Sequence, residues 1–121
     1  MYEKNPERKI HFTVLITITG KGGHSSVPYL TQNPILPAFR LIQVINEKLL
    51  YEFDSFQNVA FFPAALNSGK QQNIIADQSF IKFRGECVTV ENKIQLLQIL
   101  AVSLKAIEDL YHIEAKIDYE D

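Results

Sequence analysis

The residues from Ile10 to Thr19 alternate between apolar and mostly polar side chains. Successive side chains of an extended chain point to opposite sides, so this alternation places the apolar residues on one face. The apolar set is Ile10, Phe12, Val14, Ile16 and Ile18, and the polar set is His11, Thr13, Thr17 and Thr19. The pattern predicts a β-strand with one buried face, which requires a second layer of structure to cover it.

Two longer stretches repeat their apolar residues at helical spacing instead. The first begins at Asn33, which can cap a helix with Pro34 in its first position, and ends near residues 51–54. The second follows Thr89, a typical capping residue, with Glu91 in the first turn. The expected buried stripes are Ile35, Phe39, Ile42, Ile45 and Leu49 in the first helix, and Ile94, Leu97, Ala101, Leu104, Ile107 and Tyr111 in the second.

Three further stretches have strand patterns. Residues 59–66 are apolar on both faces and contain Pro63, which cannot donate to a ladder, so we expect an edge strand. Residues 67–70 supply turn residues, and the chain returns through a strand at residues 80–87. Residues 113–120 alternate as regularly as the first strand. The expected solvent-facing residues of the 80–87 strand are Lys82, Arg84 and Glu86.

The resulting order, strand-helix-strand-strand-helix-strand, predicts an α+β fold of the ferredoxin-like β-α-β-β-α-β type. It consists of a four-stranded antiparallel sheet with two helices on one face. We expect residues 1–9 to be a solvated lead-in and residues 10–121 to form a single domain. This layout hosts many functions. A single cysteine, Cys87, excludes ferredoxin chemistry, and we expect that residue to be a small, inward-facing strand residue.

Composition excludes further classes of function. Twelve basic and fourteen acidic residues leave a formal charge of −2, which argues against a nucleic-acid partner. No apolar run approaches the roughly 18 residues that a membrane span needs. One cysteine cannot form an internal disulfide, which agrees with a reducing compartment. We therefore expect a cytoplasmic protein with no membrane or nucleic-acid partner.

A glycine-rich segment follows the first strand directly and reads Gly20-Lys21-Gly22-Gly23-His24-Ser25-Ser26-Val27-Pro28. Its glycines let the chain leave the strand sharply and bring His24 to the rim of the sheet. The segment fits neither nucleotide motif, because Ser25 stands where a dinucleotide fingerprint needs glycine and Lys21 is followed by Gly22 rather than by Ser or Thr.

This segment, the Asn33-Pro34-Ile35 helix start and the later Asn73-Ile74-Ile75-Ala76-Asp77 resemble motifs of one family. That family is the dimerisation or lid domain of zinc-dependent exopeptidases and amidohydrolases, among them bacterial carboxypeptidases, aminoacylases, hippurate hydrolases and succinyl-diaminopimelate desuccinylase. The resemblance extends over nearly the whole chain from Ile10 onward. It departs at Ala76, where the family usually has proline.

The resemblance implies a domain that works within a larger metallohydrolase. The zinc ligands and the general base would belong to a catalytic domain of the same parent protein, and this chain alone would be inactive and hold no metal. The domain would form a homodimer through an edge strand and a helix. His24 would reach the partner's active site and stabilise the oxyanion formed during amide hydrolysis, and Asn73 would contact the substrate.

The residues themselves agree with the expectation of no metal site on this chain. Its three histidines, His11, His24 and His112, lack the partners of a hydrolytic zinc site, which needs at least three converging ligands.

One substrate contact departs from the family. Glu86 stands where the family often has an arginine that recognises a substrate carboxylate, and Arg84, two residues or about 7 Å earlier on the same face, is the candidate substitute. The alternative that the residues leave open is a free-standing ferredoxin-like module that binds a small ligand or has a regulatory role.

Overall fold

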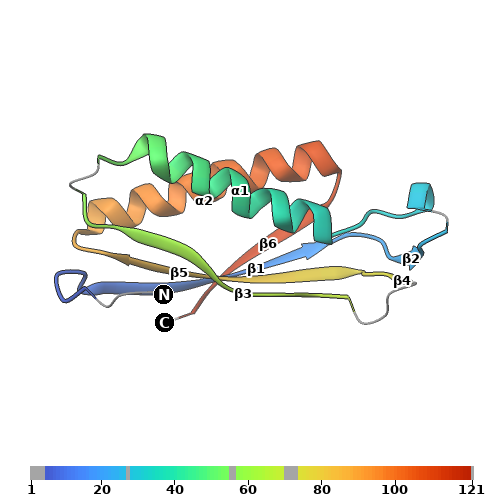
Figure 1. Ribbon diagram of the computed structural model, residues 1–121, viewed down its shortest axis with the longest axis horizontal. Coiled ribbons are helices and arrows are strands. Elements are labelled where there is room, and N and C mark those ends of the chain that lie inside the picture. The colour runs from blue at the N-terminus through green and yellow to red at the C-terminus, as the bar shows by residue number, and fades with distance from the viewer. Residues whose placement is uncertain (1–4, 27, 55–56, 70–73, 121) are drawn as a thin grey trace.

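The computed structural model describes residues 5–26, 28–54, 57–69 and 74–120. Four strands form one antiparallel sheet in the order β3-β5-β1-β6, and both helices lie against one face of it (Figure 1). The elements are β1 Ile10–Thr19, β2 Gly23–His24, the short 3₁₀ helix η1 Pro28–Leu30, α1 Ile35–Glu52, β3 Ala60–Ser68, β4 Ile74–Ile75, β5 Gln78–Cys87, α2 Val90–Tyr111 and β6 Glu114–Glu120. The expected ferredoxin-like arrangement is confirmed. The two-stranded ladder of β2 and β4 was not expected from the sequence.

The core lies between the helices and the inward faces of the strands, and the strand alternation places it as expected. Phe12, Val14, Ile16 and Ile18 of β1 are all buried. The rings of Phe12, Phe61 and Phe83 stack in a row, with centroids 6.0 Å and 5.0 Å apart. Strands β1, β3 and β5 are therefore joined by one continuous aromatic contact beneath the helices.

The expected apolar stripe of α1 is wrong in part, because the helix is rotated relative to that stripe. The buried residues of α1 are Pro37, Ala38, Leu41 and Ile45. By contrast Phe39 is 59% exposed and Ile35 is 40% exposed. The sequence of α1 contains two adjacent rows of apolar residues at helical spacing. Periodicity alone cannot tell which of the two rows faces the sheet.

The same correction applies to α2. Its buried residues are Leu96, Ile99, Leu100, Ser103, Leu104 and Ile107, whereas Ile94 is 52% exposed. The N-terminus is as expected, because the Thr89 hydroxyl accepts a hydrogen bond from the backbone N–H of Asn92 at 3.1 Å. At the start of α1 the carboxamide oxygen of Asn33 accepts from the N–H of Ile35 at 2.9 Å. Pro34 itself takes the position just before the helix rather than its first turn.

Strand β3 lies at the edge of the sheet, as Pro63 indicated. The register between β3 and β5 shifts between Pro63 and Ala65, which is a β-bulge at the proline. Beyond the bulge Ala64, Ala65 and Leu66 are exposed. The opposite edge is β6, which pairs only with residues 13–19 of β1.

Side-chain contacts link the segment before β1, whose described residues are exposed or half-buried, to the rest of the domain. The carboxamide oxygen of Asn58 accepts hydrogen bonds from Arg8 Nε at 2.6 Å and from Asn5 Nδ2 at 3.2 Å. Asn58 Nδ2 donates to the carboxylate of Glu7 at 3.2 Å. This contact ties the chain entering β1 to the loop that enters β3. Neither α1 nor α2 has the length and apolar character of a helix that crosses a membrane.

Candidate functional site

The two sequence motifs singled out above lie side by side at one end of the sheet. Gly23 pairs with Ile75 and His24 pairs with Ile74 in the antiparallel β2–β4 ladder. This small ladder projects beyond the end of β1 and β5, away from the helix layer (Figure 1). The ladder follows from the fold, because Thr19 pairs with Gln78 and the segments after β1 and before β5 must therefore leave the sheet together.

Asp77 joins the two segments by two hydrogen bonds. Its backbone carbonyl accepts from the N–H of Gly20 at 2.8 Å, and its carboxylate oxygen Oδ1 accepts from the N–H of Gly22 at 2.9 Å. A Cβ atom on Gly22 would lie 2.6 Å from that oxygen and would overlap the Ile75 carbonyl. Glycine is required at position 22 because the two backbones approach too closely for a side chain.

A second contact closes the loop against the helix start and the C-terminus of α2. Lys21 and Gln32 exchange two backbone hydrogen bonds of 2.8 Å. The side chain of Gln32 donates to the carbonyl of His112 at 2.6 Å. His112 has φ 55°, a left-handed conformation that ends α2, and it is exposed as expected. The loop is therefore held from both sides.

The side chain of His24 and the whole of Asn73 lie outside the described residues. What the structure fixes is the backbone of His24 and of Ile74, which follows Asn73 directly. Ser25 and Ser26 are exposed next to them. The ladder thus brings the segment that contains His24 beside the β4 residues that follow Asn73 in sequence.

Arg84 lies elsewhere, on the sheet face opposite the helices. It pairs with Thr13 in the middle of β1, six residues along β5 from Gln78, or roughly 20 Å of strand. A terminal nitrogen of Arg84 lies 2.8 Å from His11 Nδ1, and its Nε lies 3.4 Å from Glu86 Oε2. Within one chain Arg84 is therefore far from the β2–β4 ladder.

Glu86 corrects the expectation of a solvated face on β5. It is 2% exposed, and its carboxylate lies 3.7 Å from His11 Nδ1 as well as beside Arg84. A buried carboxylate needs such partners, because desolvation without them would cost several kcal/mol. The sequence placed Arg84 and Glu86 on one face, but the contribution of His11 was missed. An alignment of β1 with β5 would have indicated the contact between His11 and Glu86, since the two residues are direct cross-strand partners.

Other ionisable groups show no catalytic arrangement in the part of the chain that the structure describes. No three His, Cys, Asp or Glu side chains there come together in a group able to hold a metal ion. Cys87 is buried against the core, as expected, and burial raises the pKa of its thiol, with a smaller opposing effect from Lys93. A raised pKa keeps the thiol protonated and unreactive.

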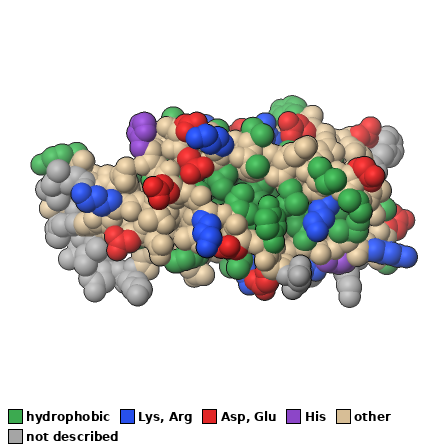
Figure 2. Space-filling view, turned by 180° about the vertical axis from the view of Figure 1, so that it is seen from behind, with side chains coloured by type: hydrophobic (Ala, Val, Ile, Leu, Met, Phe, Trp, Pro, Cys, Tyr) green, Lys and Arg blue, Asp and Glu red, His purple; other side chains and the backbone are tan. Residues whose placement is uncertain are grey.

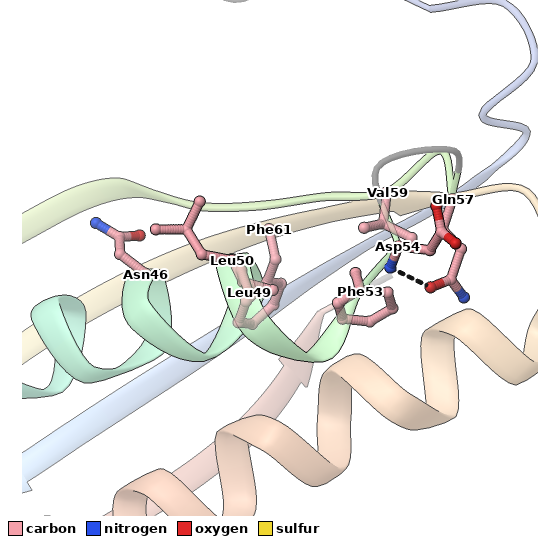
Figure 3. A pocket seen from close by; sticks show the side chains of 8 residues that line it. All are labelled: Asn46, Leu49, Leu50, Phe53, Asp54, Gln57, Val59 and Phe61. Carbon is pink, nitrogen blue, oxygen red and sulfur yellow. Dashed lines mark hydrogen bonds between the residues drawn. The ribbon is translucent and has the colours of Figure 1, made fainter.

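An apolar surface runs along the flank of α1 next to the β3 edge. The residues of the first expected stripe, Ile35, Phe39, Ile42 and Leu49, share this flank because they are three, four or seven positions apart. Where α1 ends, a groove of about 590 Å³ opens between Leu49, Leu50 and Phe53 of the helix side and Val59 and Phe61 of the strand side (Figure 3). Strand β3 contains no charged residue. We call the flank, the groove and the β3 edge together the α1–β3 surface.

A second apolar area is visible from behind (Figure 2). Among the apolar residues of α2, Ile94 is 52% exposed and Leu97 is half-buried. The neighbouring edge strand β6 has a charged residue at every second position, namely Glu114, Lys116, Asp118 and Glu120. Charged side chains on an edge strand discourage pairing with another sheet. The uncharged β3 edge is the better template for strand pairing.

Comparison with known proteins identifies the family. A family model described as a peptidase dimerisation domain matches residues 7–112. The N-acetyldiaminopimelate deacetylase of Priestia megaterium is 24% identical over 106 residues, which cover 88% of this chain and 28% of that enzyme. The enzyme of the same name from Bacillus subtilis is 23% identical over the same shares. The chain thus spans somewhat more than a quarter of the length of these curated relatives.

Solved structures show the same fold at lower sequence identity. A tripeptidase from Staphylococcus aureus superimposes with a TM-score of 0.78 and 17% identity, over 91% of this chain and 28% of that one. The aminobenzoyl-glutamate utilization protein from Klebsiella pneumoniae gives a TM-score of 0.80 at 10% identity, over 90% and 27%. With a family model matched from residue 7 to residue 112, the chain belongs to the peptidase dimerisation domain of the M20 amidohydrolase and peptidase family.

Proposed function

We propose that this domain completes the reaction centre of a metal-dependent amidohydrolase or peptidase by presenting His24, with Asn73 beside it. The observation that supports this most strongly is the pairing of His24 with Ile74 in the β2–β4 ladder. Two motifs about fifty residues apart in sequence converge at an exposed end of the domain, beyond the helix layer.

In this proposal an imidazole N–H of His24 donates to the oxygen of the scissile amide. That oxygen gains negative charge as a water molecule adds to the carbonyl carbon, so a fixed donor stabilises the transition state more than the substrate. Asn73 offers amide N–H groups that would hold the same oxygen or another part of the substrate. The metal ligands, which we expect to bind zinc, and the general base would come from another segment of the parent protein.

The decisive experiment replaces His24 by alanine in the longer protein that contains this domain. We expect kcat to fall by roughly 100- to 1,000-fold, the loss measured when one oxyanion donor is removed. Metal content, measured by atomic absorption, should not change. Unchanged turnover would leave the domain a free-standing or purely structural module.

We further propose that two copies associate through the α1–β3 surface. Antiparallel pairing of β3 with the β3 of a second copy would continue the sheet. A two-fold axis through that pair runs the two α1 helices antiparallel, which sets Phe39 of each copy toward the groove at the end of the other α1. A large exposed aromatic side chain and an apolar groove are the complementary features that stable interfaces use.

The oligomeric state of point variants tests this surface. Phe39→Lys should weaken the dimer by about 2 kcal/mol, or roughly 30-fold in Kd, in sedimentation equilibrium. Ile94→Lys is the matched control, since Ile94 is similarly exposed but lies on α2. A dimer that survives Phe39→Lys and dissociates with Ile94→Lys would move the interface to the α2 side.

Arg84 is proposed to bind an anionic group of the substrate or of a neighbouring domain. Its guanidinium is held by His11 and Glu86, which leaves it oriented on the open sheet face. Arg84→Gln should raise KM without a matching fall in kcat if that contact is made equally in the ground and transition states. An unaltered KM would restrict Arg84 to neutralising Glu86.

A further inference from the structure

The side chain of Asp77 bonds directly across from the β4 segment to the glycine loop. Its Oδ1 accepts from Gly22 N–H at 2.9 Å, while its own carbonyl accepts from Gly20 N–H at 2.8 Å. These two bonds hold alternate amides of the glycine loop against one residue. They flank the point where the chain leaves β1 and turns toward His24.

The glycine loop depends on such restraint for its conformation. Gly20, Gly22 and Gly23 have no side chain to limit their backbone angles, and glycine loses more conformational entropy on ordering than any other residue. Ala76, just before Asp77, does not fix its own φ as a proline would. The restraint therefore comes from the bonds to Asp77 and from the bridge between Lys21 and Gln32.

The position of Asp77 also argues against a role in global stability. The residue is exposed and directly precedes Gln78, which pairs with Thr19, seven residues along β1 from Phe12 of the aromatic stack. A single hydrogen bond at an exposed site contributes only about 1 kcal/mol. Its effect should appear in the local placement of the β2–β4 ladder, where a displacement of about 1 Å of a reacting group can cost 100-fold in rate.

We propose that Asp77 is a positioning residue: its carboxylate fixes the Gly22 amide and thereby sets the β2–β4 register that presents His24 and Asn73 together. This inference rests on the proposed function of His24. It assigns no contact with substrate to Asp77. The residue acts through the loop backbone.

The test is a double-mutant cycle in the longer enzyme. Asp77→Ala should lower kcat by about 10-fold, with a smaller change in KM, because the donor is misplaced rather than removed. In a His24→Ala background the same substitution should have no further effect. Asp77→Asn, whose amide oxygen still accepts from Gly22, should recover most of the loss. Asp109→Ala, which removes another exposed carboxylate from the surface of α2, should leave kcat unchanged.

The outcomes separate the two proposals. If His24→Ala itself leaves turnover intact, the proposed function fails, whatever Asp77 does. If His24→Ala is impaired and Asp77→Ala is not, only the positioning role fails. A loss with Asp77→Ala that is as large in the His24→Ala background as in the wild type would show a general structural effect and would also overturn it.

Amide hydrogen exchange gives a readout that is independent of activity. In Asp77→Ala the Gly22 amide should exchange about 10-fold faster, while core amides of β1 keep their protection. Unchanged exchange at Gly22 would contradict the positioning role. Should Asp77→Ala fail to fold, Asp77→Glu takes its place: moving the carboxylate by one methylene, about 1.5 Å, breaks the fit to Gly22 and should give the same kinetic pattern.

Discussion

Gly85→Ala should destabilise the domain through one steric conflict that the structure defines. Gly85 lies on β5 directly opposite Phe12 of β1, and the Phe12 ring covers it. A Cβ atom on Gly85 would lie 2.5 Å from Phe12 Cε1 and closer still to two other ring atoms. Since ordinary contacts begin near 3.4 Å, the ring has to move by about 0.9 Å or more.

The ring has little room for that movement. Phe12 is only 7% exposed and stacks on Phe61, which stacks on Phe83 in turn. The ammonium group of Lys93 lies 5.3 Å from the Phe12 ring centroid on another side. Overpacking of this kind costs 1–3 kcal/mol, so we expect a loss of about 2 kcal/mol and a fall in Tm of roughly 8 °C.

Chemical and thermal unfolding measure this loss, and two further variants give it a physical cause. Phe12→Leu in the Gly85→Ala background should recover part of the stability, because the smaller side chain makes room for the new methyl group. Gly23→Ala is the comparison: its Cβ would meet the Thr31 Cγ2 carbon at 2.9 Å, and a change of the Thr31 rotamer, which gives up the hydrogen bond of that hydroxyl to the Pro28 carbonyl, relieves the contact. The cost should therefore be about 1 kcal/mol and smaller than at Gly85. A Gly85→Ala protein as stable as the wild type, or a double variant no better than the sum of its parts, would refute the steric explanation.

Three other substitutions or reactions test separate features of the fold. Thr89→Ala should cost about 1 kcal/mol and Thr89→Ser much less, because the hydroxyl that caps α2 is lost only in the former; urea unfolding decides this. Ser103→Ala should raise the free energy of unfolding by up to about 1 kcal/mol, since the buried Ser103 hydroxyl has no hydrogen-bond partner among the described residues. Ser79→Ala should lower it, because Ser79 Oγ donates to the Pro34 carbonyl at 2.8 Å. Cys87 should react with iodoacetamide at pH 8 only as fast as the protein unfolds, because burial raises its thiol pKa; rapid labelling of the native protein would contradict this.

The sequence predicts the fold well because strand alternation reports burial directly. The limits of β1 and the capping residue of α2 follow from local pattern alone. The helix faces do not, because α1 has two adjacent apolar rows. One of them, which includes Phe39, borders the open β3 edge instead of the core. A helix whose apolar arc is wider than its sheet contact indicates an additional interface, and periodicity alone cannot assign the two rows.

The candidate site was predicted as two separate motifs, and their meeting follows from topology. Once β1 and β5 are neighbouring antiparallel strands, the segments that contain His24 and Asn73 must leave the sheet at the same end. The burial of Glu86 does not follow from the pattern of β5 alone. The contact with His11 emerges only when β5 is aligned with β1, which makes His11 and Glu86 cross-strand partners.

The Phe12–Gly85 contact also bears on the site, although it lies at the other end of the sheet. The same ladder that pairs Phe12 with Gly85 pairs Thr19 with Gln78, from which the two site segments leave. A slip of one residue would turn every β5 side chain to the wrong face, and a slip of two would set Phe12 against Phe83 or Cys87. Only glycine accommodates the ring, so this one fit selects the register among the available alignments. The alignment of the His24 and Asn73 segments is thus set by a packing contact seven residues along β1 from the end at which they meet.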